Sequence, residues 1–243
     1  MREEILAEFE KYVNENKIAD YSRFFKTGLG EYGEGDKFLG VKVPDTRKVV
    51  KKYFASMSFE EIEEFLNSPY HEHRLFALLV LVYKYKSKKL TSEAQRERIY
   101  DFYVSHANRI NNWDLVDVTA PHIVGAHLLQ RDKTLLYNFA NSNDLWKKRI
   151  AIVSTFAFIN SHQFQDTFDI ADILLQDKHD LIHKAVGWAI RNVGNKNEKA
   201  MLEYLTPRYK KMPRAMLRYA IEKLDEELRL QYLRGEIEWS IDT

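Results

Sequence analysis

Residues 142–149 read SNDLWKKR and open a helical stretch in which apolar residues recur every three or four positions. Two looser copies of this opening are SPYHEHR at 68–74 and KHDLIHK at 178–184, each followed by a helix rich in Ala, Val, Leu or Ile. Helix pairs that repeat every 30 to 40 residues or so are typical of HEAT-like solenoids. We therefore predict an all-α fold, an α-solenoid of HEAT-like antiparallel helix pairs with a concave basic surface.

The helical spacing is interrupted by only five prolines and nine glycines, and no stretch predicts a sheet. We expect one continuous domain over residues 1–243, in which each helix pair buries its apolar face against its neighbours. The expected helices lie near 2–15, 19–26, 44–56, 58–67, 70–86, 91–107, 113–129, 131–141, 143–160, 163–175, 179–193, 196–206, 213–223 and 225–234.

The composition excludes several classes of protein. The chain has no cysteine, so disulfides, thiolate metal sites and cysteine nucleophiles are absent, which is compatible with a reducing compartment. No apolar run approaches the roughly 18 residues of a membrane span, and the acidic residues near the start do not resemble a signal peptide. We expect a cytoplasmic monomer that does not bind membranes.

Basic charge is concentrated in one part of the chain. Residues 145–218 hold thirteen Lys or Arg against seven Asp or Glu, whereas the net charge of the whole chain is +1. The densest run is 207–218, which has five basic residues and no acid. This pattern fits either a solvated helix and turn or a binding site for a polyanion.

Residues 26–36, KTGLGEYGEGD, depart from the helical pattern and contain four of the nine glycines. A glycine-rich loop can hold phosphate through free backbone amides, but Glu31, Glu34 and Asp36 would repel an anion. We therefore predict a mobile or irregular surface loop at 27–36, followed by a helix with Pro44 in its first turn.

Most catalytic templates are missing. The sequence has no phosphate-binding Walker loop, no zinc-binding HExxH helix and no GxSxG serine elbow. His71 and His73 are two residues apart, which on a helix directs them to different faces, so we predict neither a metal nor a cofactor. The remaining histidines considered are interpreted as surface or helix-end residues: His122, His127, His179 and His183.

Trp113 and Asp117 in the stretch WDLVD lie four residues apart, one turn along a predicted helix. An indole beside a carboxylate can hold a cation. The alternative is structural: Trp113 would be a core residue, Asp114 a first-turn acid stabilised by the helix dipole, and Asp117 a partner for a base such as Arg149. The residues alone leave both interpretations open.

Five segments, taken together, resemble a known family. They are FLGVKVPDTR at 38–47, WDLVD at 113–117, WKKR at 146–149, KAVGW at 184–188 and MPR at 212–214. Each segment is short, but their order and spacing are similar to those of the bacterial HEAT-like-repeat alkylpurine DNA glycosylases, the AlkD-like family. The resemblance covers most of the chain.

The resemblance implies a monofunctional glycosylase that removes cationic N3- or N7-alkylated purines from double-stranded DNA by hydrolysis, without metal or redox cofactor. It implies that Trp113 and Trp188 are aromatic walls, Asp117 is the catalytic carboxylate and Arg149 binds phosphate. We assign the further contacts to the DNA backbone to basic side chains near these motifs. Together with Arg149 they are Lys147, Lys148, Lys184, Arg191, Arg214 and Arg218.

Two alternatives accompany this prediction. In the family, a helix before the Phe38-Leu39-Gly40 stretch helps to recognise damaged DNA, whereas this chain has the glycine-rich loop at 27–36. An AlkD-like homologue that binds DNA without glycosylase activity is therefore the first alternative. A HEAT-type protein-interaction scaffold is the second; it predicts an apolar groove and requires no role for Asp117.

Overall fold

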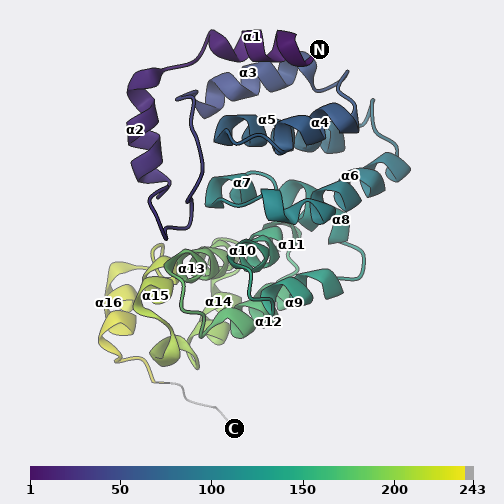
Figure 1. The fold of residues 1–243 in the computed structure, drawn as a ribbon. Helices are drawn as coiled ribbons and strands as arrows, with labels where there is room; N and C mark the ends of the chain where they lie inside the picture. The colour runs from purple at the N-terminus through teal and green to yellow at the C-terminus, as the bar shows by residue number, and fades with distance from the viewer. Residues whose placement is uncertain (239–243) are drawn as a thin grey trace. The chain divides into compact units, whose positions relative to one another are not determined.

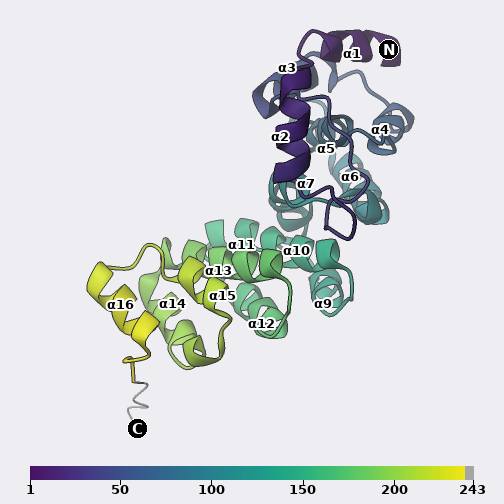
Figure 2. The ribbon, with the colours of Figure 1, turned by 60° about the vertical axis from the view of Figure 1, so that its left-hand side comes forward.

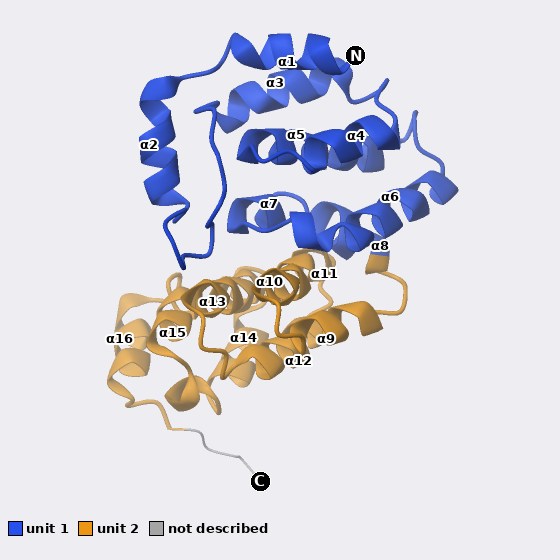
Figure 3. Cartoon of the chain, viewed as in Figure 1, with its two compact units in different colours: residues 1–127 blue, residues 128–243 orange. Residues whose placement is uncertain are grey.

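The structure, a computed structural model, describes residues 1–238. Figure 3 shows two compact units, residues 1–127 (unit 1) and 128–243 (unit 2). The described residues form helices and turns with no strand; Lys37 and Tyr70 make one isolated bridge. The prediction of an all-α fold is confirmed. The single continuous domain expected over residues 1–243 stays a prediction.

Unit 1 is built from helices that stack in layers (Figure 1). Helices α3 and α5 lie side by side, α4 packs on α5, and α2 runs crosswise to α3 and α5 (Figure 2). The elements are α1 (Arg2–Glu10), α2 (Glu15–Phe24), α3 (Val43–Tyr53), α4 (Phe59–Leu66), α5 (His71–Lys86), α6 (Glu93–Ser105), the 3-10 turn η1 (Ala107–Arg109), α7 (Trp113–Asp117), the π-helical turn η2 (Pro121–Gly125) and α8 (Ala126–Leu128).

Helix α5 forms the centre of unit 1. It is buried from His71 to Val82, because neighbouring helices cover it on all sides, and this includes the four polar residues of its first turn. The flanking helices begin at capping boxes, in which Ser58 and Glu61 start α4 and Ser92 and Gln95 start α6.

Unit 2 repeats the arrangement of paired helices. Helix α9 packs on α10 and α12 on α13, while α10, α13 and α15 follow one another in a second layer (Figure 1). The elements are α9 (Thr134–Ala140), α10 (Leu145–Ser154), α11 (Phe156–Asn160), α12 (Gln165–Leu174), α13 (Asp180–Gly194), α14 (Glu198–Leu205), the 3-10 turn η3 (Tyr209–Lys211), α15 (Arg214–Ala220) and α16 (Glu226–Arg234). These paired helices agree with the predicted α-solenoid.

One glycine sets the distance between two helices of unit 2. Gly187 of α13 faces α15, and a Cβ at this position would collide with the backbone oxygen of Met216 and the side chain of Tyr219. The missing side chain therefore allows α13 and α15 to approach closely.

The predicted long helix at 113–129 is wrong. Helix α7 ends at Asp117, because Pro121 has no N–H to donate to the preceding turn. The amide of Gly125 instead bonds to the oxygen of Ala120, five residues back, which produces the π-helical turn. The predicted helix at 143–160 is similarly divided, into α10 and α11, at Thr155.

The glycine-rich loop is irregular and mostly exposed, as predicted, but two of its residues face inward. Leu29 is 93% exposed, whereas Gly33 is buried and the Asp36 side chain is only 4% exposed. The carboxylates of Glu31 and Glu34 accept the amides of Gly28 and Gly30 at 2.8 Å each, so these amides do not form a phosphate cradle. The loop follows α2; it does not replace an N-terminal helix.

Candidate active site

Helix α7 carries both Trp113 and Asp117. It is five residues long and begins where the side-chain oxygen of Asn112 accepts the Trp113 amide at 2.9 Å. Trp113 and Asp117 are half-buried, one at each end of the helix, whereas Asp114 is buried. The predicted pair is thus present on one short helix, and the acid between its members faces the interior.

The Trp113 ring belongs to an aromatic cluster that extends to the loop. It stacks on Phe25, with centroids 5.4 Å apart, and meets the edge of Phe24 at 5.7 Å. Phe25 in turn stacks on Phe38 and lies 4.8 Å from the His71 ring. Phe24 is 62% exposed, so the cluster runs from the interior of unit 1 to its surface.

His71 lies at the centre of a buried group of charges. Its Nε2 lies 2.8 Å from Asp114 and its Nδ1 lies 3.1 Å from Asp36. Asp36 also accepts hydrogen bonds from Arg74 at 2.6 Å and from the side-chain Nδ2 of Asn112 at 3.3 Å. The side chains of His71, Asp36 and Arg74 are at most 4% exposed. We call Asp36, His71, Arg74 and Asp114 the His71 cluster.

The His71 cluster is charged at neutral pH. Burial opposes protonation of His71, but the charge of Asp114 and the hydrogen bonds to Asp114 and Asp36 outweigh it and raise the pKa of His71 to about 9. Burial also opposes ionisation of Asp36, yet its hydrogen bond to His71 and the charge of Arg74 lower the pKa of Asp36. Two buried cations therefore balance two carboxylates.

Glu72, the residue after His71, holds the segment that follows the glycine-rich loop to α5. Its carboxyl group accepts the backbone amides of Leu39, Gly40 and Val41 at 2.9–3.2 Å. Burial raises the pKa of Glu72, although these amides act in the opposite direction. This role is not visible in the sequence, because a run of four polar residues normally indicates a solvated helix end.

The interpretation of His127 as a surface or helix-end residue is wrong, because His127 is 1% exposed and stacks on Tyr100. His71 has two carboxylate partners that the sequence does not indicate. The π-helical turn at 121–125 changes the helical register just before His127, and this change directs the His127 ring inward. His179 is confirmed as a helix-end residue, since its side chain accepts the Leu181 amide and caps α13.

Arg149 and Trp188 lie in unit 2. Arg149, on α10, is 5% exposed, and its Nη1 donates to the Leu181 oxygen at 2.6 Å. Trp188, on α13, is half-buried and meets the edge of Phe156 at a centroid distance of 4.6 Å. That these two residues act together with Trp113 and Asp117 stays a prediction.

The remaining basic residues predicted to bind DNA differ in their partners. Three of them form ion pairs with acids of unit 2: Lys148 with Asp177 at 2.7 Å, Lys184 with Asp180 at 2.6 Å, and Arg191 with Glu222. Lys147 lies over the Phe139 ring, Arg214 donates to the Leu233 oxygen, and Arg218 is exposed. The positive charge of the ion-paired residues is largely compensated.

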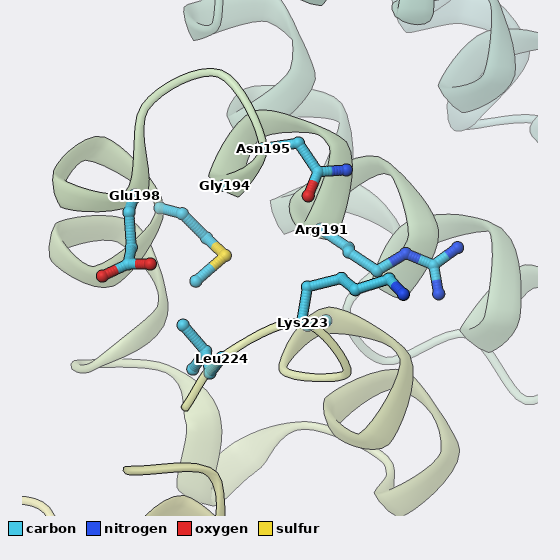
Figure 4. A pocket seen from close by; sticks show the side chains of 8 residues that line it. Arg191, Gly194, Asn195, Glu198, Lys223 and Leu224 are labelled. Atoms are coloured by element: carbon cyan, nitrogen blue, oxygen red, sulfur yellow. The ribbon is translucent and has the colours of Figure 1, made fainter. Parts of the chain in front are cut away.

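Two depressions are candidate ligand sites. The first, beside Arg191, has a volume of about 50 Å³, which is far below that of a typical ligand pocket. Figure 4 shows the Arg191 and Lys223 side chains extending in the same direction at its rim. The second has a volume of about 390 Å³ and lies in unit 1. Its lining is Arg47, Val82, Tyr83, Lys86, Ser87, Val118 and His122.

The described part of the chain, residues 1–238, contains no group of three or more His, Asp or Glu side chains arranged to hold a metal ion. Within the same residues, no helix has both the length and the apolar character needed to cross a bilayer.

Residues 5–224 match the family described as DNA alkylation repair enzyme, and the chain belongs to this family. The structure is also similar to one described as a predicted DNA alkylation repair enzyme from Enterococcus faecalis, with a TM-score of 0.68 and 16% identity over 88% of this chain and 97% of that chain. No curated protein matches the chain.

Membership of this family gives the protein a role in DNA repair, with DNA as its partner. The predicted resemblance to the AlkD-like family is confirmed.

Proposed function

We propose that the protein is a DNA glycosylase that removes cationic N3- or N7-alkylated purines from double-stranded DNA. Family membership supports the repair role. The observation that carries the proposed reaction is helix α7, on which Trp113 and Asp117 are partly accessible while Asp114 is bound inside. A carboxylate beside an aromatic face suits a substrate that carries positive charge.

The chemistry requires little activation of the leaving group. When the glycosidic bond breaks, the positively charged alkylpurine takes the bonding electron pair and leaves as a neutral base. The sugar then develops the positive charge that the Asp117 carboxylate would stabilise. Water adds to C1′ of the sugar, and Asp117 would orient this water and accept its proton.

Trp113 and Trp188 would offer their faces to the cationic base and sugar, and Arg149 would bind phosphate. The basic side chains most available for backbone contacts are Arg214 and Arg218, because both are exposed. In unit 1, Arg47 and Lys86 line the larger depression together with Val118, the residue after Asp117. This cationic surface would add phosphate contacts near the carboxylate.

The proposed function is tested by release of 7-methylguanine and 3-methyladenine from methylated duplex DNA. We expect Asp117→Asn to lower the rate of release by at least about 100-fold, because the amide neither stabilises the sugar cation nor accepts a proton. Asp101→Asn is the matched control, since it removes an exposed carboxylate of unit 1 that has no proposed role.

Three outcomes distinguish the candidate functions. Base release that depends on Asp117 supports the glycosylase. Salt-sensitive DNA binding by the parent protein without base release would assign it to the non-catalytic DNA-binding homologues. Absence of DNA binding at low salt would favour a protein-interaction scaffold.

A further inference from the structure

We infer that the His71 cluster is a positioning device for helix α7, and that it fixes the orientation of Trp113 toward the substrate. The cluster connects three separate parts of unit 1: the glycine-rich loop through Asp36, helix α5 through His71 and Arg74, and α7 through Asp114. This inference rests on the proposed function, in which Trp113 contacts the reacting nucleotide.

Helix α7 depends on outside support because it is only five residues long. A helix of this length is not stable by itself in water. Two residues fix the start of α7: Asn112, which contacts the His71 cluster, and Asp114, which belongs to it. Asn112 caps the Trp113 amide and donates to Asp36, while Asp114 accepts the Leu115 amide at 2.8 Å and pairs with His71.

The indole of Trp113 reaches His71 by a second route. Its stacking partner, Phe25, lies against the His71 ring, and Phe38 stacks on the same imidazole at 4.9 Å. The imidazole therefore holds the backbone of α7 through Asp114 and supports the Trp113 ring through Phe25. A change at His71 would move both.

The charges of the cluster favour one arrangement. His71 faces Asp36 from the loop and Asp114 from α7, with Arg74 and Glu72 on its own helix and Arg109 of η1 near Asp36 and Arg74. Removing one charge from such a buried group leaves its partner uncompensated. Because Asp114 is bound in this way, the carboxylate that α7 offers toward solvent is Asp117.

The inference is tested on the full chain labelled with 5-fluorotryptophan, by fluorine NMR. The Trp113 signal is assigned by its loss in Trp113→Phe. We expect His71→Gln to shift the Trp113 signal and leave the Trp188 signal in place. His127→Gln is the matched control, because it replaces another buried histidine of unit 1, whose ring stacks on Tyr100. It should leave both signals unchanged.

The same variants separate positioning from binding in single-turnover base release. His71→Gln should slow the chemical step by roughly 10-fold to 100-fold, the effect of a small misplacement, with DNA affinity changed by less than about twofold. His71→Arg should restore much of the rate, because the guanidinium keeps the charge and can bond to both carboxylates.

The parent protein supplies a readout that does not depend on variants. Its Trp113 signal should change between pH 8 and pH 10, as His71 loses its proton, and this change should be absent in His71→Arg. Should His71→Gln fail to fold, Asp36→Asn replaces it, since this nearly isosteric change removes one carboxylate charge and should also shift the Trp113 signal.

Two results would overturn the inference: an unchanged Trp113 signal in folded His71→Gln or Asp36→Asn, or an equal shift in His127→Gln. Loss of the proposed function is recognised separately. If the parent protein releases no base, the glycosylase proposal fails, while the fluorine signals still decide whether the cluster positions Trp113.

Discussion

Trp113 and Trp188, the two indoles proposed to face the substrate, are held in different ways. Trp113 rests on aromatic rings that lead to a buried group of four charges. Trp188 meets the edge of Phe156 and follows Gly187, whose missing side chain lets the backbone of α13 lie close to α15. The support of Trp113 depends on the protonation of His71, whereas that of Trp188 depends on the close packing of α13 against α15 at Gly187. The two units should therefore respond to different perturbations.

The largest expected effect is that of high pH on unit 1. His71 has its pKa raised from 6.5 to about 9 in the folded protein, so its stabilising contribution is fully present below pH 6.5 and is lost as the pH rises through about 9. The shift corresponds to on the order of 3 kcal/mol. Denaturant unfolding, followed by the fluorine signal of Trp113, should show a lower midpoint at pH 10 than at pH 7.

The Trp188 signal is the internal control for this experiment, because the His71 cluster lies wholly in residues 1–127. An equal fall of both midpoints would contradict the difference between the two supports. The same measurement on His71→Arg should remove the pH dependence at Trp113.

A smaller effect is expected from a methyl group in unit 2. Gly187→Ala places a Cβ against the backbone oxygen of Met216, and the backbone must shift to accept it. Overpacking of this kind costs about 1–3 kcal/mol. The Trp188 midpoint should fall while the Trp113 midpoint stays constant. A neutral Gly187→Ala would show that α13 and α15 can separate without loss.

The smallest effects concern the surface cations. Arg218 is exposed, and among residues 1–238 no ion pair of this side chain is found, whereas Lys148 is paired with Asp177. Arg218→Gln should reduce the slope of log affinity against log salt by about one, if it contacts one phosphate. Lys148→Gln should change the slope less. The measurement is a salt titration of duplex DNA binding, and a larger change for Lys148 would reverse this ranking.

The sequence predicted the helices well wherever apolar spacing decided the structure. The helix expected at 70–86 is α5 (His71–Lys86), and that expected at 179–193 is α13 (Asp180–Gly194). It failed near Pro121, where a missing N–H and a π-helical turn divide a continuous apolar pattern. Local propensity could have suggested a break there, but the turn that replaced the helix depends on tertiary packing.

The site could be predicted only in part. Trp113 and Asp117 lie in one short motif, so their spacing was visible in the sequence. The His71 cluster was not, because Asp36 and Asp114 lie 35 and 43 positions from His71. Nothing in a polar first turn shows that it will be buried, since burial is decided by the loop and helix that later cover it.

The contact between Asn112 and Asp36 joins positions 76 residues apart. The five residues of α7 cannot form a lasting helix before this contact closes, because an isolated helix of that length has too few hydrogen bonds to offset its nucleation cost. Closing so long a segment carries a loop entropy that local helices such as α5 avoid. We therefore expect the proposed catalytic helix to be among the last parts of unit 1 to become ordered during folding, because its stabilising contact joins distant positions of the chain.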